Sequence, residues 1–344
     1  MTVQMSFSEA INDAVRVAMR RDKNVILMGE DVAGGAKVDH LQDEGAWGGV
    51  FGVTKGIVEE FGRERVIDTP IAEAGYMGAA VSAAVTGLRP ISELMFNDFI
   101  GSCLDEVMNQ AAKFHYMFGG KAKVPLTIRT IDGAGFNAAA QHSQSLYALF
   151  THIPGLKVVV PSNPYDVKGL LLTAIFDDDP VVVCEDKTLY SVKGQVGEGF
   201  YTIPFGQAEI KREGTDLTIV GIGKQVGTAL KAADQLAKKG FSVEVIDPRT
   251  LSPLDEKTII KSVMKTGRLI IVDEAYPRCG AASDIAAIVG EKAFDYLDAP
   301  IKRVTAPHSP VPFSPPLEKA YMPSPEKILA AFHEMVGDNV FTSV

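Results

Sequence analysis

Cysteine is scarce in this chain, which has three among its 344 residues, Cys103, Cys184 and Cys279. They are odd in number and far apart, and none lies in the C-x-x-C spacing that favours a disulfide framework or a zinc site. The sequence therefore argues against a disulfide-stapled secreted domain. We expect reduced thiols and a cytoplasmic protein.

The chain also lacks a basic cluster and a long apolar run. Its 34 Lys and Arg are outnumbered by 43 Asp and Glu, which gives a formal net charge of −9. Binding to a phosphate backbone needs grouped cations, so we expect no nucleic-acid partner. No stretch of about 18 apolar residues occurs, and the N-terminal region lacks the apolar core of a signal peptide, so we expect no membrane association.

Short apolar runs that alternate with helical patterns are abundant instead. Ser6 and Glu9 form a capping box, which predicts that the first element is an amphipathic helix. Its apolar face comprises Ala10, Ile11, Ala14, Val15, Ala18 and Met19. Six apolar runs follow, at 25–28, 66–68, 90–95, 126–130, 157–160 and 181–183. Because these runs show no polar alternation, they are typical of parallel strands buried on both faces.

A second set of elements follows a glycine-rich stretch at 187–205, which we interpret as a connection between domains. Strands are predicted at 217–220, 243–247, 269–273 and 301–304, and helices at 227–239, 255–265 and 325–335. We therefore predict an α/β protein with domains at 1–190 and 207–344 and a linker at 191–206. The proline-dense stretch 306–326 should contain neither regular helix nor central strand, and should lie over a surface or a partner.

Two polar residues occupy positions suited to chemistry. Glu73 follows a predicted strand and a proline turn and begins a helix rich in Gly and Ala, whose small residues allow close contact with another helix. Ligands of open α/β sheets bind at the carboxyl ends of strands. His142 lies in a polar loop and could move protons near neutral pH. The alternatives are that Glu73 only complements the helix dipole and that His142 is a hydrogen-bonded loop residue.

Other motifs are weaker. The glycines of DLTIVGIGKQVG form G-x-G-x-x-x-G, in which the third glycine is displaced by one position from a dinucleotide fingerprint, so an ordinary strand-to-helix turn is favoured. No P-loop, zincin or G-x-S-x-G motif occurs. We interpret the FDDDP run at 176–180 as a solvated helix end.

Several motifs together resemble the beta subunit of the thiamine-diphosphate-dependent component of 2-oxo acid dehydrogenase complexes. They are, in order, DTPIAE, LMFNDF, NQAAKFHYMFGGKAKVP, AAQHSQ and HIPGLKVVVPSN. Within that family, LMFNDF and the segment VDHLQDEGAWGGVFGVTKG look most like the beta subunits of acetoin dehydrogenases.

The resemblance implies a transketolase-like pyrimidine-binding domain followed by a transketolase C-terminal domain. It also implies an α2β2 heterotetramer, in which a G-D-G motif of the alpha subunit holds magnesium and the diphosphate of thiamine diphosphate. This chain has no G-D-G motif, so it should form only the pyrimidine half of the cofactor site.

Site residues also come from the resemblance. Glu73 matches the glutamate that bonds the N1′ atom of the aminopyrimidine and favours its imino tautomer. Phe99 matches the aromatic residue stacked on that ring, Met95 a residue that touches it, and His142 a histidine near the thiazolium and the lipoyl channel. The resemblance also implies a monovalent cation such as potassium, held mainly by backbone oxygens of Leu126, Ala174, Ile175, Asp177 and Asp179.

These inferences predict a subunit that cleaves acetoin and transfers the acetyl unit to lipoyl groups of a transacetylase core. Pyruvate or branched-chain 2-oxo acids are the alternative substrates, since part of the substrate pocket is expected on the alpha subunit. A non-catalytic assembly subunit is the alternative from another class.

Overall fold

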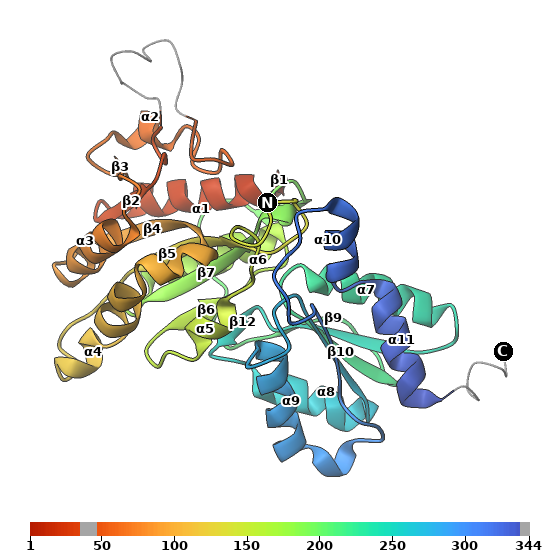
Figure 1. Ribbon diagram of the computed structural model, residues 1–344. Helices are drawn as coiled ribbons and strands as arrows, with labels where there is room; N and C mark the ends of the chain where they lie inside the picture. The colour runs from red at the N-terminus through yellow and green to blue at the C-terminus, as the bar shows by residue number, and fades with distance from the viewer. Residues whose placement is uncertain (35–46, 338–344) are drawn as a thin grey trace. The chain divides into compact units, whose positions relative to one another are not determined.

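The computed structural model describes residues 1–34 and 47–337, and its contacts divide the chain into two units (Figure 1). Unit 1 comprises the described parts of Met1–Asp132 together with Leu149–Phe205, and unit 2 comprises Gly133–Ala148 with the described residues from Gly206 onward. The first part of the segment 38–56, on which the likeness to acetoin dehydrogenases partly rests, lies outside the described residues. The limits of the predicted domains and linker stay predictions.

Unit 1 contains a parallel sheet, as the apolar runs predict. Its strands are β2 (Val25–Gly29), β3 (Val66–Asp68), β4 (Arg89–Phe96), β5 (Thr127–Asp132), β6 (Lys157–Val159) and β7 (Val181–Asp186). They lie in the order β6-β7-β5-β4-β2-β3, and each neighbouring pair is parallel. The carboxyl ends of β3, β2 and β4 therefore adjoin one another.

The helices of unit 1 are α1 (Phe7–Arg21), α2 (Ile57–Phe61), α3 (Glu73–Val85), α4 (Phe114–Met117) and α6 (Pro164–Phe176). The short helix α5 (Tyr147–Thr151) begins in unit 2 and ends in unit 1. The predicted capping box at the start of α1 is present, and all six residues of its predicted apolar face are buried. α1 packs against α6, and both share a core with alternate residues of the strands, such as Val25 and Leu27. Neighbouring strand residues point to the opposite face, where α3 contacts β4.

The prediction that a helix is the first element was wrong, because strand β1 (Thr2–Ser6) precedes it. β1 pairs antiparallel with β8 (Lys193–Gly197), which lies inside the stretch interpreted as a plain connection. Both strands are short, and each finds its partner on a distant part of the chain. A strand whose stability depends on such a non-local partner gives only a weak local signal.

Unit 2 contains a mixed sheet in the order β14-β13-β10-β11-β9. Its strands are β9 (Glu209–Arg212), β10 (Leu217–Gly221), β11 (Val243–Asp247), β13 (Leu269–Asp273) and β14 (Lys302–Thr305), and only the β9–β11 pair among them is antiparallel. Helices α7 (Gln225–Ala237) and α11 (Pro325–Val336) share one core with this sheet, and α8 (Glu256–Thr266) and α9 (Ala281–Lys292) pack together against it. The predicted second α/β unit is confirmed.

The proline-dense stretch differs from prediction, because it contains the short helix α10 (Pro315–Tyr321). Pro315 and Pro316 fill its first turn, where a missing N–H breaks no intrahelical hydrogen bond. Glu318 and Tyr321 of this helix are buried. Within residues 1–34 and 47–337, no helix combines the length and the apolar character that crossing a membrane requires.

Candidate functional site

Glu73 is the first residue of α3 and follows the carboxyl end of β3, as the sequence predicts. It is half-buried, and the residue before it supplies no side-chain cap. A carboxylate at this position complements the positive end of the helix dipole, which was the alternative reading. Gly75 and Ala79 on the same helix are exposed, so α3 presents small residues next to Glu73.

Two buried groups face Glu73 within unit 1, and we call the three the acidic cluster: Glu30, Glu73 and Tyr76. Glu30 directly follows β2 and is 9% exposed. Burial raises the pKa of Glu30 above its ordinary value, and the negative charge of Glu73 raises it further. Burial likewise raises the pKa of Tyr76, with the charge of Glu30 adding to it. The surroundings therefore favour the protonated forms of Glu30, at the carboxyl end of β2, and of Tyr76 on α3.

Some polar atoms at these strand ends have no hydrogen-bond partner among the described residues. They are Glu30 Oε1, the Tyr76 hydroxyl and both polar atoms of the Asn97 side chain. Asn97 follows β4 and is fully buried. Buried polar atoms without partners are costly in a folded protein unless a water or ligand satisfies them. These atoms can accept hydrogen bonds from the amino group of a heteroaromatic ring and donate hydrogen bonds to its ring nitrogens.

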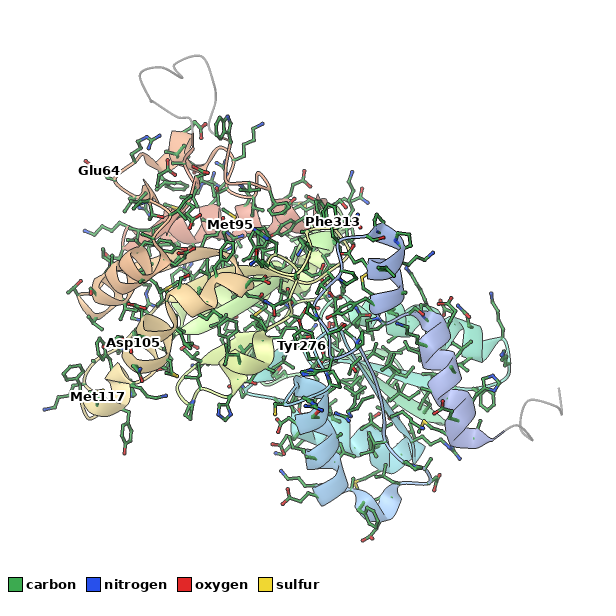
Figure 2. The ribbon with its side chains drawn as sticks, viewed as in Figure 1. Glu64, Met95, Asp105, Met117, Tyr276 and Phe313 are labelled. Carbon is green, nitrogen blue, oxygen red and sulfur yellow. The ribbon has the colours of Figure 1, made fainter. Side chains whose placement is uncertain are left out.

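Met95 and Phe99 lie at the end of the neighbouring strand β4. The pairing of β4 with β5 shifts register between Leu94 and Phe96, so Met95 occupies a β-bulge (labelled in Figure 2). Bulges occur often beside active sites, where they redirect side chains. Met95 is buried, and half-buried Phe99 packs edge-to-face on Phe96 with ring centroids 5.6 Å apart. An apolar wall thus adjoins the acidic cluster along the sheet edge.

His142 belongs to unit 2, in the stretch Gly133–Ala148. Its side chain is half-buried, between exposed Gln141 and buried Ser143. The structure therefore places Glu73, Met95 and Phe99 at the carboxyl ends of β3 and β4, the two strands that flank β2 in one unit, and places His142 on an irregular loop of the other.

A buried charge network, which sequence reasoning missed, crosses the sheet of unit 1. The Arg129 guanidinium is 1% exposed and donates to both oxygens of Glu185 at 2.7 Å and to Glu93 at 2.6 Å. The Tyr190 hydroxyl donates to Glu185 at 3.0 Å. Burial raises the pKa of Glu93, although Arg129 opposes the shift. The network fixes the middle of β4, β5 and β7 beside the bulge at Met95.

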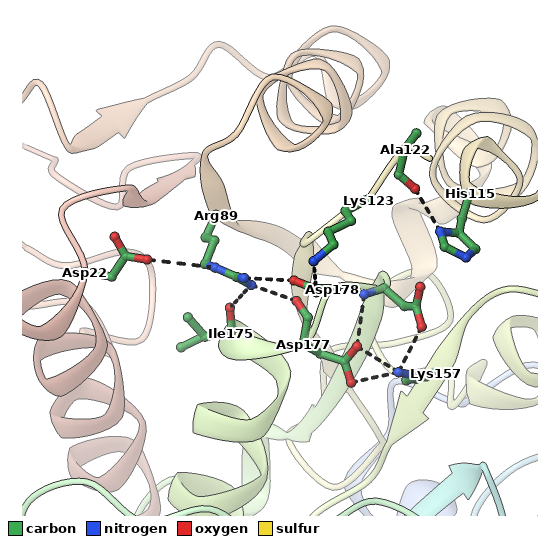
Figure 3. Close-up of polar contacts among 10 residues, drawn as sticks. Asp22, Arg89, His115, Ala122, Lys123, Lys157, Ile175, Asp177 and Asp178 are labelled. Atoms are coloured by element: carbon green, nitrogen blue, oxygen red, sulfur yellow. Dashed lines mark hydrogen bonds and ion pairs between the residues drawn. The ribbon is translucent and has the colours of Figure 1, made fainter. Parts of the chain in front are cut away.

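The five residues predicted to ligate a monovalent cation surround the end of α6: Leu126, Ala174, Ile175, Asp177 and Asp179. The carbonyls of Ile175 and Asp177 accept hydrogen bonds from Arg89 at 3.3 and 2.8 Å (Figure 3). The Leu126 carbonyl accepts from the backbone N–H of Val181 at 2.9 Å. Side-chain and backbone donors thus already meet part of this oxygen set, and cation binding stays a prediction.

The FDDDP run lies at the end of α6, as predicted, and its partly exposed aspartates also form ion pairs, which the prediction did not include. Lys157 lies 2.7 Å from Asp177 and 3.1 Å from Asp179. Lys123 donates to Asp178 at 2.6 Å and lowers the pKa of that carboxyl. Within the described ranges, no three His, Cys, Asp or Glu side chains gather as a metal site would need.

Comparison with known proteins identifies the family. Residues 3–193 match the transketolase pyrimidine-binding domain, and residues 206–328 match the transketolase C-terminal domain. The chain is 68% identical over 334 residues to the beta subunit of acetoin:2,6-dichlorophenolindophenol oxidoreductase of Bacillus subtilis, a match covering 97% of this chain and 98% of that one. The chain belongs to the beta-subunit family of acetoin and 2-oxo acid dehydrogenases.

Other members of this beta-subunit family are less similar. The acetoin:2,6-dichlorophenolindophenol oxidoreductase beta subunit of Cupriavidus necator is 57% identical, with 96% of this chain and 97% of that one covered. The pyruvate dehydrogenase E1 beta subunit of Rickettsia felis is 47% identical over the same shares. Among solved structures, a split-gene transketolase described as an inactive beta4 tetramer matches with a TM-score of 0.75 at 20% identity, covering 96% of this chain and 98% of that one, which supports the fold.

The family resemblance predicts Glu73, Met95 and Phe99 as site residues, which stays a prediction, and it did not point to Glu30, Tyr76 or Asn97. Glu30 ends the run VILMGE, so the rule that pointed to Glu73, a polar residue just past a buried parallel strand, would also have found Glu30.

Proposed function

We propose that the chain is the beta subunit of an acetoin dehydrogenase. With an alpha subunit it cleaves acetoin, releases acetaldehyde and passes the acetyl unit to lipoyl groups of a transacetylase core. The observation that carries the choice of substrate is the higher identity to acetoin oxidoreductase beta subunits than to those of pyruvate dehydrogenases. An α2β2 assembly in the cytoplasm, with magnesium held mainly by the alpha subunit, belongs to the same proposal.

Thiamine diphosphate is the cofactor that fits this site. The aminopyrimidine ring carries an amino group and ring nitrogens, which match the unpartnered atoms of Glu30, Tyr76 and Asn97 beside half-buried Glu73. Buried Met95 and the ring of Phe99 offer an apolar surface for its face. When bound, the cofactor supplies the electron sink needed to break the carbon–carbon bond of acetoin.

The residues of this chain would act by holding protons and excluding water. Glu73 would hold a proton at N1′ of the aminopyrimidine, a role supported by its position at the start of α3, just past the carboxyl end of β3. Met95 and Phe99 would keep water from the ring. His142 would assist transfer of the acetyl unit to the lipoyl arm.

The decisive experiment replaces Glu73 by Gln, which keeps the size of the side chain and removes its acid function. Activity is measured as acetoin-dependent reduction of 2,6-dichlorophenolindophenol by the chain reconstituted with an alpha subunit, thiamine diphosphate and magnesium. We expect a loss of at least about 100-fold, the scale of a lost acid–base group, with assembly unchanged by size-exclusion chromatography. Glu59→Gln, at an exposed position of α2, is the matched control.

A wild-type rate for Glu73→Gln would overturn the proposed role of Glu73. Full activity after replacement of both Glu73 and His142 would favour an assembly subunit without catalytic groups. A higher rate on pyruvate than on acetoin would assign the chain to the pyruvate dehydrogenases instead.

A further inference from the structure

The stretch Gly133–Ala148, called here the His142 loop, is bound to unit 2 although the residues on either side of it belong to unit 1. Residues 133–146 contain no helix or strand. A long irregular segment inside a compact unit needs partners for its backbone groups and is commonly functional. The contacts that this loop makes within unit 2 therefore show how His142 is held.

Glu318 of α10 accepts the first set of backbone bonds. Its carboxylate is 3% exposed and receives the N–H of Gly135 at 2.9 Å and that of Asn137 at 3.0 and 3.2 Å. Hydrogen bonds to a charged, buried acceptor are stronger than neutral ones. Asn137 has a φ of 54° and Ala139 a φ of 60°, a left-handed backbone that persists only when its surroundings enforce it.

Glu274, just after β13, holds the beginning of the loop. It accepts the backbone N–H of Ala134 and lies 2.5 Å from the ammonium of Lys224, which in turn donates to the Ala134 carbonyl at 2.5 Å. The amide of Gln225 donates to the same carboxylate at 3.1 Å. Both backbone groups of Ala134 are thus bound by one ion pair, between buried Glu274 and half-buried Lys224.

The far end of the loop is attached as well. The Tyr147 hydroxyl donates to Asp273, whose carboxylate also accepts the N–H of Ala282 at 3.2 Å. The Tyr276 hydroxyl (labelled in Figure 2) lies 3.4 Å from the side-chain oxygen of Gln144, two residues after His142. Contacts before and after His142 therefore leave its segment little freedom to move.

We infer that Glu318 and Glu274 are positioning residues for His142, which fix the backbone of its loop so that the imidazole meets the lipoyl arm. This inference rests on the proposed function, because it takes from it the role of His142. The proline-dense stretch then has a role in holding the loop, because its helix α10 carries Glu318.

The test is a double-mutant cycle on the reconstituted enzyme with the lipoyl domain of its transacetylase. Glu318→Gln keeps one acceptor oxygen but turns an NH2 group toward a backbone donor. We expect it to lower kcat for acetyl transfer to the lipoyl domain by up to about 100-fold, the effect of a small misplacement, with less change in KM. In a His142→Gln background the same substitution should change kcat by less than about twofold, since residues acting through one group are not additive.

Two further measurements separate positioning from a general loss of structure. Hydrogen exchange of the peptide covering 133–148 should become faster in Glu318→Gln and Glu274→Gln, while the exchange of β10 and β13 stays unchanged. Glu291→Gln, on an exposed position of α9, is the control that should alter neither rate nor exchange.

Additive effects of Glu318→Gln and His142→Gln on kcat would overturn the inference. If His142→Gln impairs acetyl transfer but hydrogen exchange of the loop is unchanged in Glu318→Gln and Glu274→Gln, the inference is overturned as well. If His142→Gln keeps full transfer, the proposed role of His142 fails, and the positioning role fails with it. The two failures are distinguishable, because only the second involves a normal rate in the single His142 variant.

Discussion

The charge network around Arg129 gives a prediction that the structure specifies closely. Arg129→Met keeps the unbranched stem of the side chain but removes the guanidinium and its bonds to Glu93 and Glu185. Both carboxylates are almost completely buried and would then lack their cation. Removing one partner of a buried ion pair costs about 3–5 kcal/mol of unfolding free energy. In a unit of this size, that cost lowers the midpoint of thermal unfolding by roughly 6–20 °C.

The pH dependence of the loss follows from Glu93. Because burial raises the pKa of Glu93, the folded state binds its proton more tightly than the unfolded state does. The stability from this group is present at low pH and is lost as the pH rises through the folded pKa. Without the opposing charge of Arg129 that pKa rises further. The free-energy gap between wild type and Arg129→Met should therefore widen from about pH 5 to about pH 8.

Thermal unfolding of the assembled enzyme at both pH values measures this gap. Arg20→Met is the matched control, since Arg20 pairs with Glu60 at 2.5 Å with its side chain 58% exposed and should contribute at most about 1 kcal/mol. Equal losses in the two variants, or a gap that does not change with pH, would refute the reasoning.

Three smaller perturbations test other parts of unit 1, each by the same thermal unfolding measurement. Ser6→Ala removes the cap of α1 and should cost about 1 kcal/mol, whereas Ser6→Thr should cost less. Gly155→Ala should cost more than about 1 kcal/mol, because φ is +104° and the added Cβ would lie 2.0 Å from the Ala112 carbonyl oxygen; a neutral effect would contradict the backbone geometry. Lys168→Met leaves Asp13 without the ammonium 2.6 Å away and should lower the free energy of unfolding by about 1–3 kcal/mol. An unchanged free energy of unfolding would show that this contact does not stabilise unit 1.

Much of the fold could be predicted where local pattern and tertiary environment agree. The predicted strands at 66–68, 243–247 and 269–273 coincide with β3, β11 and β13. The clearest case is β13, which is buried along its whole length and begins with four consecutive apolar residues. β1 and β8 could not be predicted in this way, because each strand is stabilised by pairing with the other, which lies far away in the sequence. α10 was missed because proline was counted as a helix breaker without regard to its position in the first turn.

The candidate site likewise contains residues that a local sequence pattern predicts and residues that it does not. Glu73 and Glu30 each follow a buried strand, which makes both accessible to sequence reasoning. Tyr76 belongs to the acidic cluster because it is buried, and the sequence of α3 alone does not predict which of its faces is covered. The bond from Gly135 to Glu318 joins residues 183 positions apart, and no local period predicts such a pairing.

The separation between the His142 loop and its anchors matters while the protein is being made. At a synthesis rate of roughly 5–20 residues per second, Glu318 leaves the ribosome about 10–40 s after Gly135. Throughout that interval the two left-handed residues have no carboxylate to hold them. The segment carrying the histidine is therefore among the last parts of the nascent chain to take its final shape, whatever the speed at which the sheet of unit 1 forms.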